Sequence, residues 1–215
     1  MNIKTKKQNK AVLFLPVLGL AALTTGLVIG SAQNTSAATA TATTVVTANV
    51  GAVVGIGVTD ITINMSAPSP SGSFATGTGT VSVSTNDASG YSVYLTSNST
   101  TSTSLDHTSV SGASIASIAT NETISGSVTK FSAMNTWGWS NDGEVYHPVT
   151  VKGTKSTASI PTLYRRTNAP STTADNSTLT IGVTGDSTLV SGQYTGTLLL
   201  TAIPNSNTAE IANYE

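Results

Sequence analysis

The stretch Thr178-Leu179-Thr180-Ile181-Gly182-Val183 is the clearest guide to the fold of this chain. Its large apolar residues occupy every second position and alternate with threonine and glycine, which is typical of a β-strand with one buried face. Residues 185–186 (Gly-Asp) favour a turn directly after it. A last strand is expected over residues 192–203, and Pro204 ends it.

The same period of two recurs in earlier segments of the chain. Residues 54–58 and residues 61–65 alternate in opposite phases, which predicts a bulge or tight turn at residues 59–60. Residues 79–84 and 91–95 flank an Asn-Asp-Ala-Ser-Gly turn sequence, and together they predict a hairpin.

A second hairpin is predicted around Asn141-Asp142-Gly143, because asparagine and glycine tolerate positive φ. Residues 67–79 hold two prolines and three glycines and are expected to form a loop. Residues 152–176 are also expected to be irregular. Short strands separated by turns, with no long helical pattern, predict an all-β fold. Its specific form is an Ig-like antiparallel β-sandwich over residues 45–204.

The N-terminus has the features of a secretory signal peptide. Four lysines lie in the first ten residues, residues 11–30 are uncharged and mostly apolar, and small residues follow. We therefore expect residues 1–38 to be a signal/transmembrane helix, and the rest of the chain to be extracellular, at the cell surface. The small residues that mark the cleavage region are Ser36, Ala37 and Ala38.

An uncleaved membrane anchor is the alternative to a cleaved signal. Residues 11–30 are long enough to cross a hydrocarbon core of about 30 Å, and the lysines before them fit the inner side of the membrane. If the signal is not cleaved, residues 11–30 are the predicted contact with the membrane. Residues 39–44, an Ala/Thr repeat, are expected to be a flexible spacer, and residues 205–215 a C-terminal tail.

Charge and cysteine content exclude some classes of protein. Beyond residue 38 the chain has five basic and ten acidic residues, which is a net charge of −5. Nucleic-acid binding needs a basic patch, and only the pair Arg165-Arg166 stands out, so we expect no nucleic-acid partner. The chain has no cysteine, so no disulfide can stabilise it and its stability must come from its core.

No catalytic motif emerges from the sequence. The Gly-x-Ser-x-Gly elbow of serine hydrolases is absent, and the two histidines, His107 and His147, lie far apart along the chain. Glu144 precedes His147 by three positions, but residues three apart on a strand point to opposite faces. We therefore predict a non-enzymatic protein without a metal or cofactor, and a secreted hydrolase is the weakest alternative.

Aromatic residues give a more informative pattern. Trp137 and Trp139 share one face of a predicted strand. They could fill the core, or they could belong to an exposed platform on which sugar rings stack. The residues of such a ligand-binding platform would be Trp139, Tyr146, Tyr164, Arg165 and Arg166.

Three stretches resemble known families: residues 135–148, residues 178–202 and Gly90-Tyr91-Ser92-Val93. They resemble exported Ser/Thr-rich β-sandwich surface proteins of candidate-phyla-radiation bacteria, and more distantly the WxL cell-wall-binding domain of Gram-positive surface proteins. Gly192 and Tyr194 match the Gly-x-Tyr of the WxL family's closing strand.

The WxL motifs themselves are not retained. Leu200 and Ala202 stand where the Trp and Leu of that family are expected, and Tyr91-Ser92-Val93 replaces the first motif. The resemblance covers most of residues 79–204. It implies a β-sandwich at the cell surface, and cell-wall binding only for a chain that keeps the motifs.

These observations predict an extracellular surface or envelope protein with a structural or adhesive role. A more specific hypothesis is self-assembly by strand donation, in which residues 44–65 of one copy pack in the sheet of a neighbour. The alternative for this segment is that it forms the first strands of its own domain. A carbohydrate-binding module is the alternative function. The expected partners are a cell-wall or host glycan, another envelope protein, or a second copy of the chain.

Overall fold

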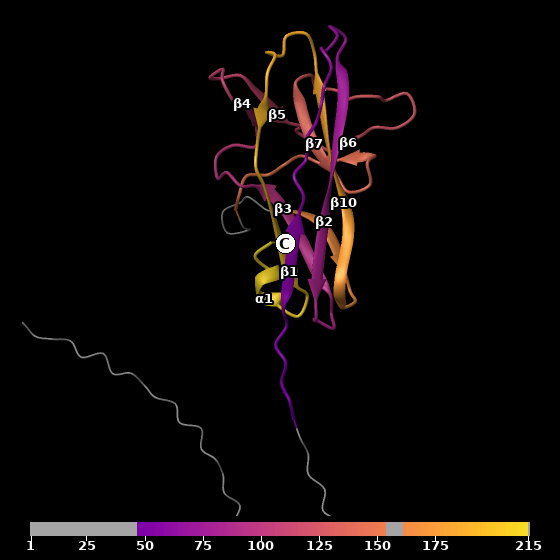
Figure 1. The fold of residues 1–215 in the computed structure, drawn as a ribbon, viewed down its shortest axis with the longest axis vertical. Coiled ribbons are helices and arrows are strands. Elements are labelled where there is room, and N and C mark those ends of the chain that lie inside the picture. The colour runs from indigo at the N-terminus through magenta and orange to yellow at the C-terminus, as the bar shows by residue number, and fades with distance from the viewer. Residues whose placement is uncertain (1–46, 154–160, 215) are drawn as a thin grey trace, which may run out of the picture. The chain divides into compact units, whose positions relative to one another are not determined.

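The computed structural model describes residues 47–153 and 161–214 of the chain (Figure 1). The fold is all-β, as predicted, and the helix α1 (Thr208–Ile211) has only four residues. The strands of the described residues are β1 (Val54–Val58), β2 (Ser73–Thr85), β3 (Tyr91–Ser97), β4 (Leu105–His107), β5 (Ser114–Ser117), β6 (Glu122–Thr123), β7 (Thr136–Ser140), β8 (Val145–Tyr146), β9 (Thr162–Thr167), β10 (Ser171–Gly185), β11 (Tyr194–Thr195) and β12 (Leu198–Pro204).

The two longest strands, β2 and β10, pair with each other and form the centre of a large sheet. Their antiparallel register runs from Asp175↔Val83 to Gly185↔Ser73, beyond an irregularity at the start of β10. The alternating residues Leu179, Ile181 and Val183 lie in β10 and are buried. β2 already begins at Ser73, so the predicted loop over residues 67–79 is too long. The first half of β2 carries glycine on its inner face, so this part of the sequence lacks the apolar alternation that is typical of a strand.

The strands form three sheets. The large sheet has the order β1-β2-β10-β7-β5-β4-β11, a second sheet has the order β12-β3-β9, and β6 pairs with β8. All strand pairs are antiparallel except β5–β7, which is parallel, so the prediction of an antiparallel sheet is wrong at this pair. The long connection between β5 and β7 leaves their relative direction free, whereas a tight turn imposes an antiparallel pair.

One predicted hairpin is wrong and the other is present. β2 and β3 are joined by the predicted turn at residues 86–90, but they belong to different sheets and do not pair. The turn sequence reverses the chain without keeping both strands in one sheet. The second predicted hairpin closes through the pair Trp139↔His147, whose backbone groups exchange hydrogen bonds of 3.1 and 2.7 Å.

Both larger sheets contribute to one main hydrophobic cluster. It combines Val81, Val83, Trp137, Trp139, Leu179, Ile181 and Val183 of the large sheet with Tyr91, Val93, Leu95 and Tyr164 of the second sheet. A smaller cluster of Ile118, Phe131 and Tyr146 lies beyond Gly182, on the other face of β10. The end of β10 is therefore buried on both faces.

The C-terminal residues pack on the domain. The ring of Tyr214 lies 4.9 Å from that of Tyr94, and the backbone N–H of Ser206 donates to Asp87 at 2.9 Å. Residues from Ala48 onward form one compact unit, so residues 205–214 belong to the domain and are not a free tail. The predicted signal peptide, anchor and spacer lie outside the described residues. Among those that are described, no helix has the length and apolar character needed to cross a membrane.

Candidate functional site: an apolar groove

The aromatic residues of the predicted platform are buried. Trp139, Tyr146 and Tyr164 are almost completely inaccessible to solvent, which contradicts the expectation of an exposed stacking surface. Trp139 Nε1 donates to the carbonyl oxygen of Pro148 at 3.2 Å, and its ring centroid lies 5.8 Å from that of Tyr164. Alternation placed the tryptophans on one face correctly, but that face is the core.

The two arginines of the predicted platform bind residues of the domain itself. Arg165 forms an ion pair with Asp175 at 2.8 Å, and the Tyr91 hydroxyl donates to the same carboxylate at 2.7 Å. Burial, and then the hydrogen bond to Asp175, raise the pKa of Tyr91 to about 12. Arg166 donates to the hydroxyl oxygen of Ser92 at 2.8 Å. The five predicted ligand-binding residues therefore do not converge on one surface.

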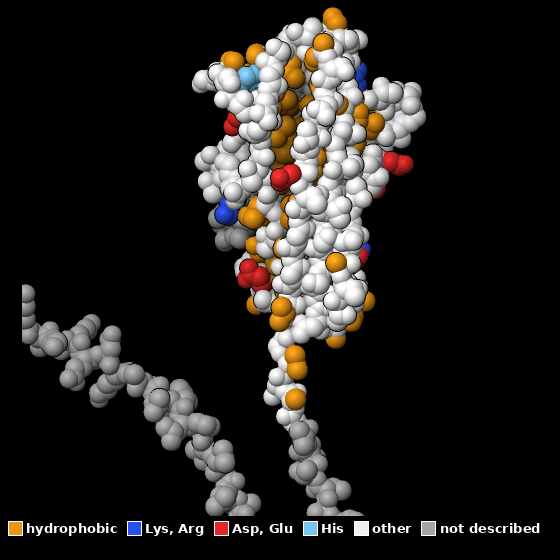
Figure 2. Space-filling model, in the orientation of Figure 1, with side chains coloured by type: hydrophobic (Ala, Val, Ile, Leu, Met, Phe, Trp, Pro, Cys, Tyr) orange, Lys and Arg blue, Asp and Glu red, His pale blue; other side chains and the backbone are white. Residues whose placement is uncertain are grey.

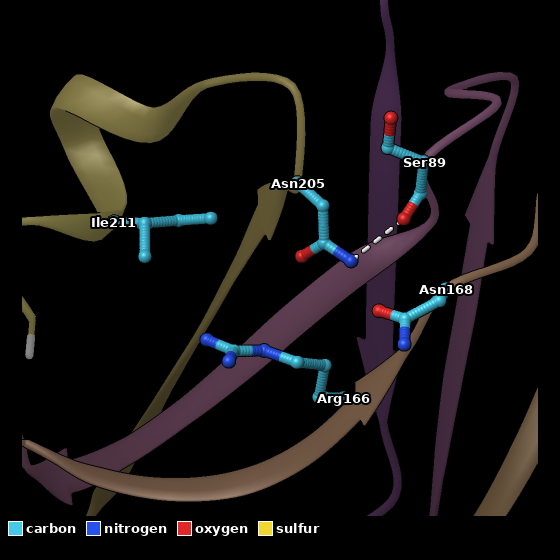
Figure 3. A pocket seen from close by; sticks show the side chains of 5 residues that line it. All are labelled: Ser89, Arg166, Asn168, Asn205 and Ile211. Atoms are coloured by element: carbon cyan, nitrogen blue, oxygen red, sulfur yellow. Dashed lines mark hydrogen bonds between the residues drawn. The ribbon is translucent and has the colours of Figure 1, made fainter.

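A small polar pocket lies where the C-terminal residues meet β3 and β9 (Figure 3). Its volume is about 380 Å³, and it is lined by Ser89, Arg166, Asn168, Asn205 and Ile211. The Asn205 side chain donates to the carbonyl oxygens of Ser89 at 2.8 Å and Thr167 at 2.7 Å, and it accepts from Ser92 at 2.7 Å. These bonds hold the C-terminal segment to the domain, so we assign the pocket a structural role.

The titratable residues also have structural roles. His147 contacts Asn121 at 3.1 Å and stacks near Trp139, and burial lowers its pKa. Asp142 accepts hydrogen bonds from the backbone N–H groups of Glu144 and Val145, which lowers the pKa of its carboxyl. Within residues 47–153 and 161–214, no three histidine or carboxylate side chains are grouped to hold a metal ion.

A second and larger concave feature is an apolar groove of about 1460 Å³, which none of the predicted site residues line. Its first wall is residues 56–68, and its second wall is residues 189–200. The floor consists of Leu105, Ile115, Trp137, Leu179, Ile181 and Val183. Figure 2 shows a band of orange, hydrophobic side chains between two pale ridges in the upper half of the domain.

Apolar side chains at the rim of the groove remain exposed. Ile56, Val58 and Val190 have 40, 47 and 42 % of their surface accessible. The floor is different, because Leu179 and Ile181 retain at most 5 % exposure. The side chains of the floor are therefore largely covered, and the exposed apolar surface of the groove lies on its walls. Asp60 is the one charged residue among its described lining residues.

Both walls also present backbone groups that no described strand pairs. Residues 60–68 run over the inner face of β2 without a backbone hydrogen bond to any other described residue. On the other side, β12 pairs with β3 along one edge, and no strand of the described chain pairs with its second edge. Free N–H and C=O groups beside apolar side chains are what an added strand requires.

The sequence explains why the first wall lies on the sheet. Gly77 and Gly79 expose the inner face of β2, and Ile61 and Ile63 pack where their side chains would be. The phase change predicted at residues 59–60 is the point where the chain leaves the edge of β2 and crosses this face. In the sequence, the glycine pair is the local signal for this wall of the groove.

Comparison with known proteins adds no constraint. No protein-family model matches the chain, and no curated protein or solved structure matches it either.

Proposed function

We propose that this chain is a non-enzymatic structural protein of the cell surface that assembles with copies of itself through the apolar groove. We interpret its architecture as an Ig-like β-sandwich, since the large sheet and the β12-β3-β9 sheet share one core. The signal-type sequence of residues 1–38 supports a position outside the cytoplasmic membrane.

One observation carries this proposal: exposed apolar side chains and unpaired backbone edges occur together along one groove. Small-molecule pockets usually hold about 300–1,000 Å³ and surround most of their ligand. This groove is larger at about 1460 Å³, is open along its length, and has two sides that can accept hydrogen bonds from a strand. A polypeptide segment therefore fits it better than a small ligand.

The oligomeric state of the whole chain tests the proposal. The full chain, collected from a bacterial host that exports it, is examined by size-exclusion chromatography with light scattering and by negative-stain electron microscopy. We expect assemblies that grow with concentration. A chain that stays monomeric at every concentration contradicts the proposal.

A groove variant supplies the control. In Val58→Asp/Val190→Asp, both substituted side chains are exposed, so the domain is expected to fold while the groove loses its apolar rim. This variant should be monomeric with unchanged circular dichroism. If it assembles like the unmodified chain, assembly does not use the groove.

A further inference from the structure

We infer that the groove of one copy binds residues 38–50 of the next copy as an added β-strand, with the even-numbered side chains of that segment facing the groove floor. This inference rests on the proposed self-assembly and names the segment that fills the groove. Four observations support it: the side-chain pattern of the segment, the exposure of its described residues 47–50, the direction in which the chain leaves the domain, and the absence of charged side chains.

The first argument is a pattern of side chains that continues unbroken into β1. Every even position from residue 38 to residue 58 is alanine, valine, isoleucine or, once, threonine: Ala38, Ala40, Ala42, Thr44, Val46, Ala48, Val50, Ala52, Val54, Ile56 and Val58. The odd positions hold threonine, asparagine and glycine, with Val45 and Val53 as exceptions. In β1 the even side chains face the core and the groove, since Val54 packs on the main cluster and Ile56 and Val58 line the groove.

This pattern gives residues 38–50 one apolar face, and the described members of that face, Ala48 and Val50, are exposed. The side chains are also small, mostly alanine and valine. The floor side chains are almost completely buried and leave little space above them. Only a strand with small inward side chains can therefore lie close enough to pair with the walls.

The second argument is that the described part of this segment is exposed. Residues 47–50 form no strand, and 83 % of the surface of Val50 is accessible. These residues make no hydrogen bond within the described part of the chain. An exposed, alternating and uncharged segment of this kind can pair as an added strand with a free sheet edge.

The third argument is direction. Asn86 holds the segment just before β1, because Val53 N–H donates to Asn86 Oδ1 at 2.6 Å and Asn86 Nδ2 donates to the Gly51 carbonyl at 3.0 Å. Residues 48–53 leave the domain at the end where β1 begins (Figure 1). Because the described residues before β1 run away from the domain at this end, we take a neighbouring copy as the acceptor.

Length and charge are compatible with this arrangement. Eight extended residues span about 26 Å, which matches residues 61–68 of the first wall, and residues 38–50 supply that length with several to spare. Residues 38–53 contain no charged side chain, and Asp60 is the one charge among the described lining residues. The contact between the segment and the groove therefore brings no two like charges together.

The decisive experiment compares two double variants of the full chain that add the same charge to opposite faces of the segment. Ala48→Asp/Val50→Asp places aspartate on the even face, and Thr47→Asp/Asn49→Asp places it on the odd face. All four side chains are exposed in the isolated domain, so both variants should keep its circular dichroism and thermal unfolding. Assembly is measured by light scattering and electron microscopy as above.

We expect the even-face variant to remain monomeric and the odd-face variant to assemble like the unmodified chain. If both variants assemble, or both fail to, the strand-donation inference is overturned while assembly of the unmodified chain still supports the proposed function. If the unmodified chain does not assemble, the proposed function itself fails.

A mixing experiment tests donor and groove in separate copies. The even-face variant has an intact groove, and Val58→Asp/Val190→Asp has an intact N-terminal segment. Mixed after separate purification, they should form a complex of one copy of each. This complex should not grow further, because its remaining groove and its remaining N-terminal segment both carry the aspartate substitutions. If the two folded variants form no complex, the inference is wrong.

Discussion

At the scale of single residues, the turn between β2 and β3 depends on a glycine that no other residue can replace without cost. Gly90 has φ +81°, and a Cβ there would contact the carbonyl group of Thr167 and, at 2.8 Å, the backbone N of Ala169. Its conformation and its close approach to the backbone of the next segment act together. The turn therefore carries the chain from one sheet to the other only with glycine at this position.

We predict that Gly90→Ala destabilises the domain by about 3 kcal/mol, from left-handed strain of about 1 kcal/mol plus the clash with backbone. Gly112→Ala is the matched control, because its φ is also +81° but no atom lies within 4 Å of the added Cβ. That variant should lose only about 1 kcal/mol. Urea unfolding measures both values, and equal losses would show that the close approach at residue 90 is unimportant.

A second residue-scale prediction concerns Tyr91 and its carboxylate partner. Tyr91→Phe keeps the buried ring but removes the 2.7 Å hydrogen bond to Asp175, which stays paired with Arg165. We expect a loss of about 1–2 kcal/mol at neutral pH. The raised pKa of Tyr91 means that its stabilising effect is complete below about pH 10, the ordinary tyrosine value, and is lost as the pH rises toward about 12.

Urea unfolding as a function of pH separates this contribution from those of the other tyrosines. The difference in unfolding free energy between the unmodified chain and Tyr91→Phe should shrink between neutral pH and the alkaline range. A difference that stays constant with pH would contradict the raised pKa.

At the scale of elements, the first wall of the groove is held by packing on glycine. Gly77 and Gly79 lie beneath Ile63 and Ile61, and a Cβ on either glycine would come within 2.6–2.9 Å of the wall. We predict that Gly77→Ala pushes residues 59–65 off β2, destabilises the domain by about 1–3 kcal/mol and speeds amide hydrogen exchange in this segment.

Gly57→Ala in β1 is the control for that prediction. No atom lies within 4 Å of its added Cβ, so the variant should be neutral or up to about 1 kcal/mol more stable. Gly77→Ala behaving like Gly57→Ala would show that the wall is not packed against the sheet.

The elements also show where reasoning from the sequence succeeds and where it stops. Alternation identified β10 because a half-buried strand needs period two. At residues 59–60 it predicted a bulge or tight turn, whereas in the structure β1 ends at Val58 and residues 61–65 form no strand. It failed for the hairpin over residues 79–95, because a turn sequence encodes a local reversal, whereas the choice of sheet depends on distant partners such as β9 and β12.

The candidate site was harder to predict for the same reason. Alternation places Trp137 and Trp139 on one face, but only long-range packing decides that this face is buried. The groove is formed by two walls separated by more than one hundred positions in the chain, and no local pattern relates them. The glycine pair of β2 and the alternating residues before β1 are the local sequence features that relate to the groove.

At the scale of the whole molecule, three turn aspartates make stability depend on acidic pH. The pKa values of Asp87, Asp142 and Asp186 are lowered mainly by hydrogen bonds, from Ser206, from the backbone of Glu144 and from Thr188 respectively. A lowered folded-state pKa contributes stability above the unfolded value of about 3.9, and this contribution disappears as the pH falls through the folded values.

We therefore predict that the urea midpoint is constant near neutral pH and falls on acidification below about pH 4. The combined variant Asp87→Asn/Asp142→Asn/Asp186→Asn should show a weaker acidic fall, because its side chains no longer titrate. An acidic fall of full size in the combined variant would contradict the assignment.

The pairing of β1 with β2 determines how the domain responds to mechanical tension. Hydrogen bonds of an antiparallel pair run perpendicular to the strands. Residues 48–53 continue away from the start of β1, so a pull on them acts along the strand and loads the bonds from Val54↔Thr85 to Val58↔Val81 in shear (Figure 1). Bonds loaded in shear must rupture together, whereas a peeling force breaks them one after another. The pairing of β1 with β2 is therefore arranged to resist tension that is applied through residues 48–53.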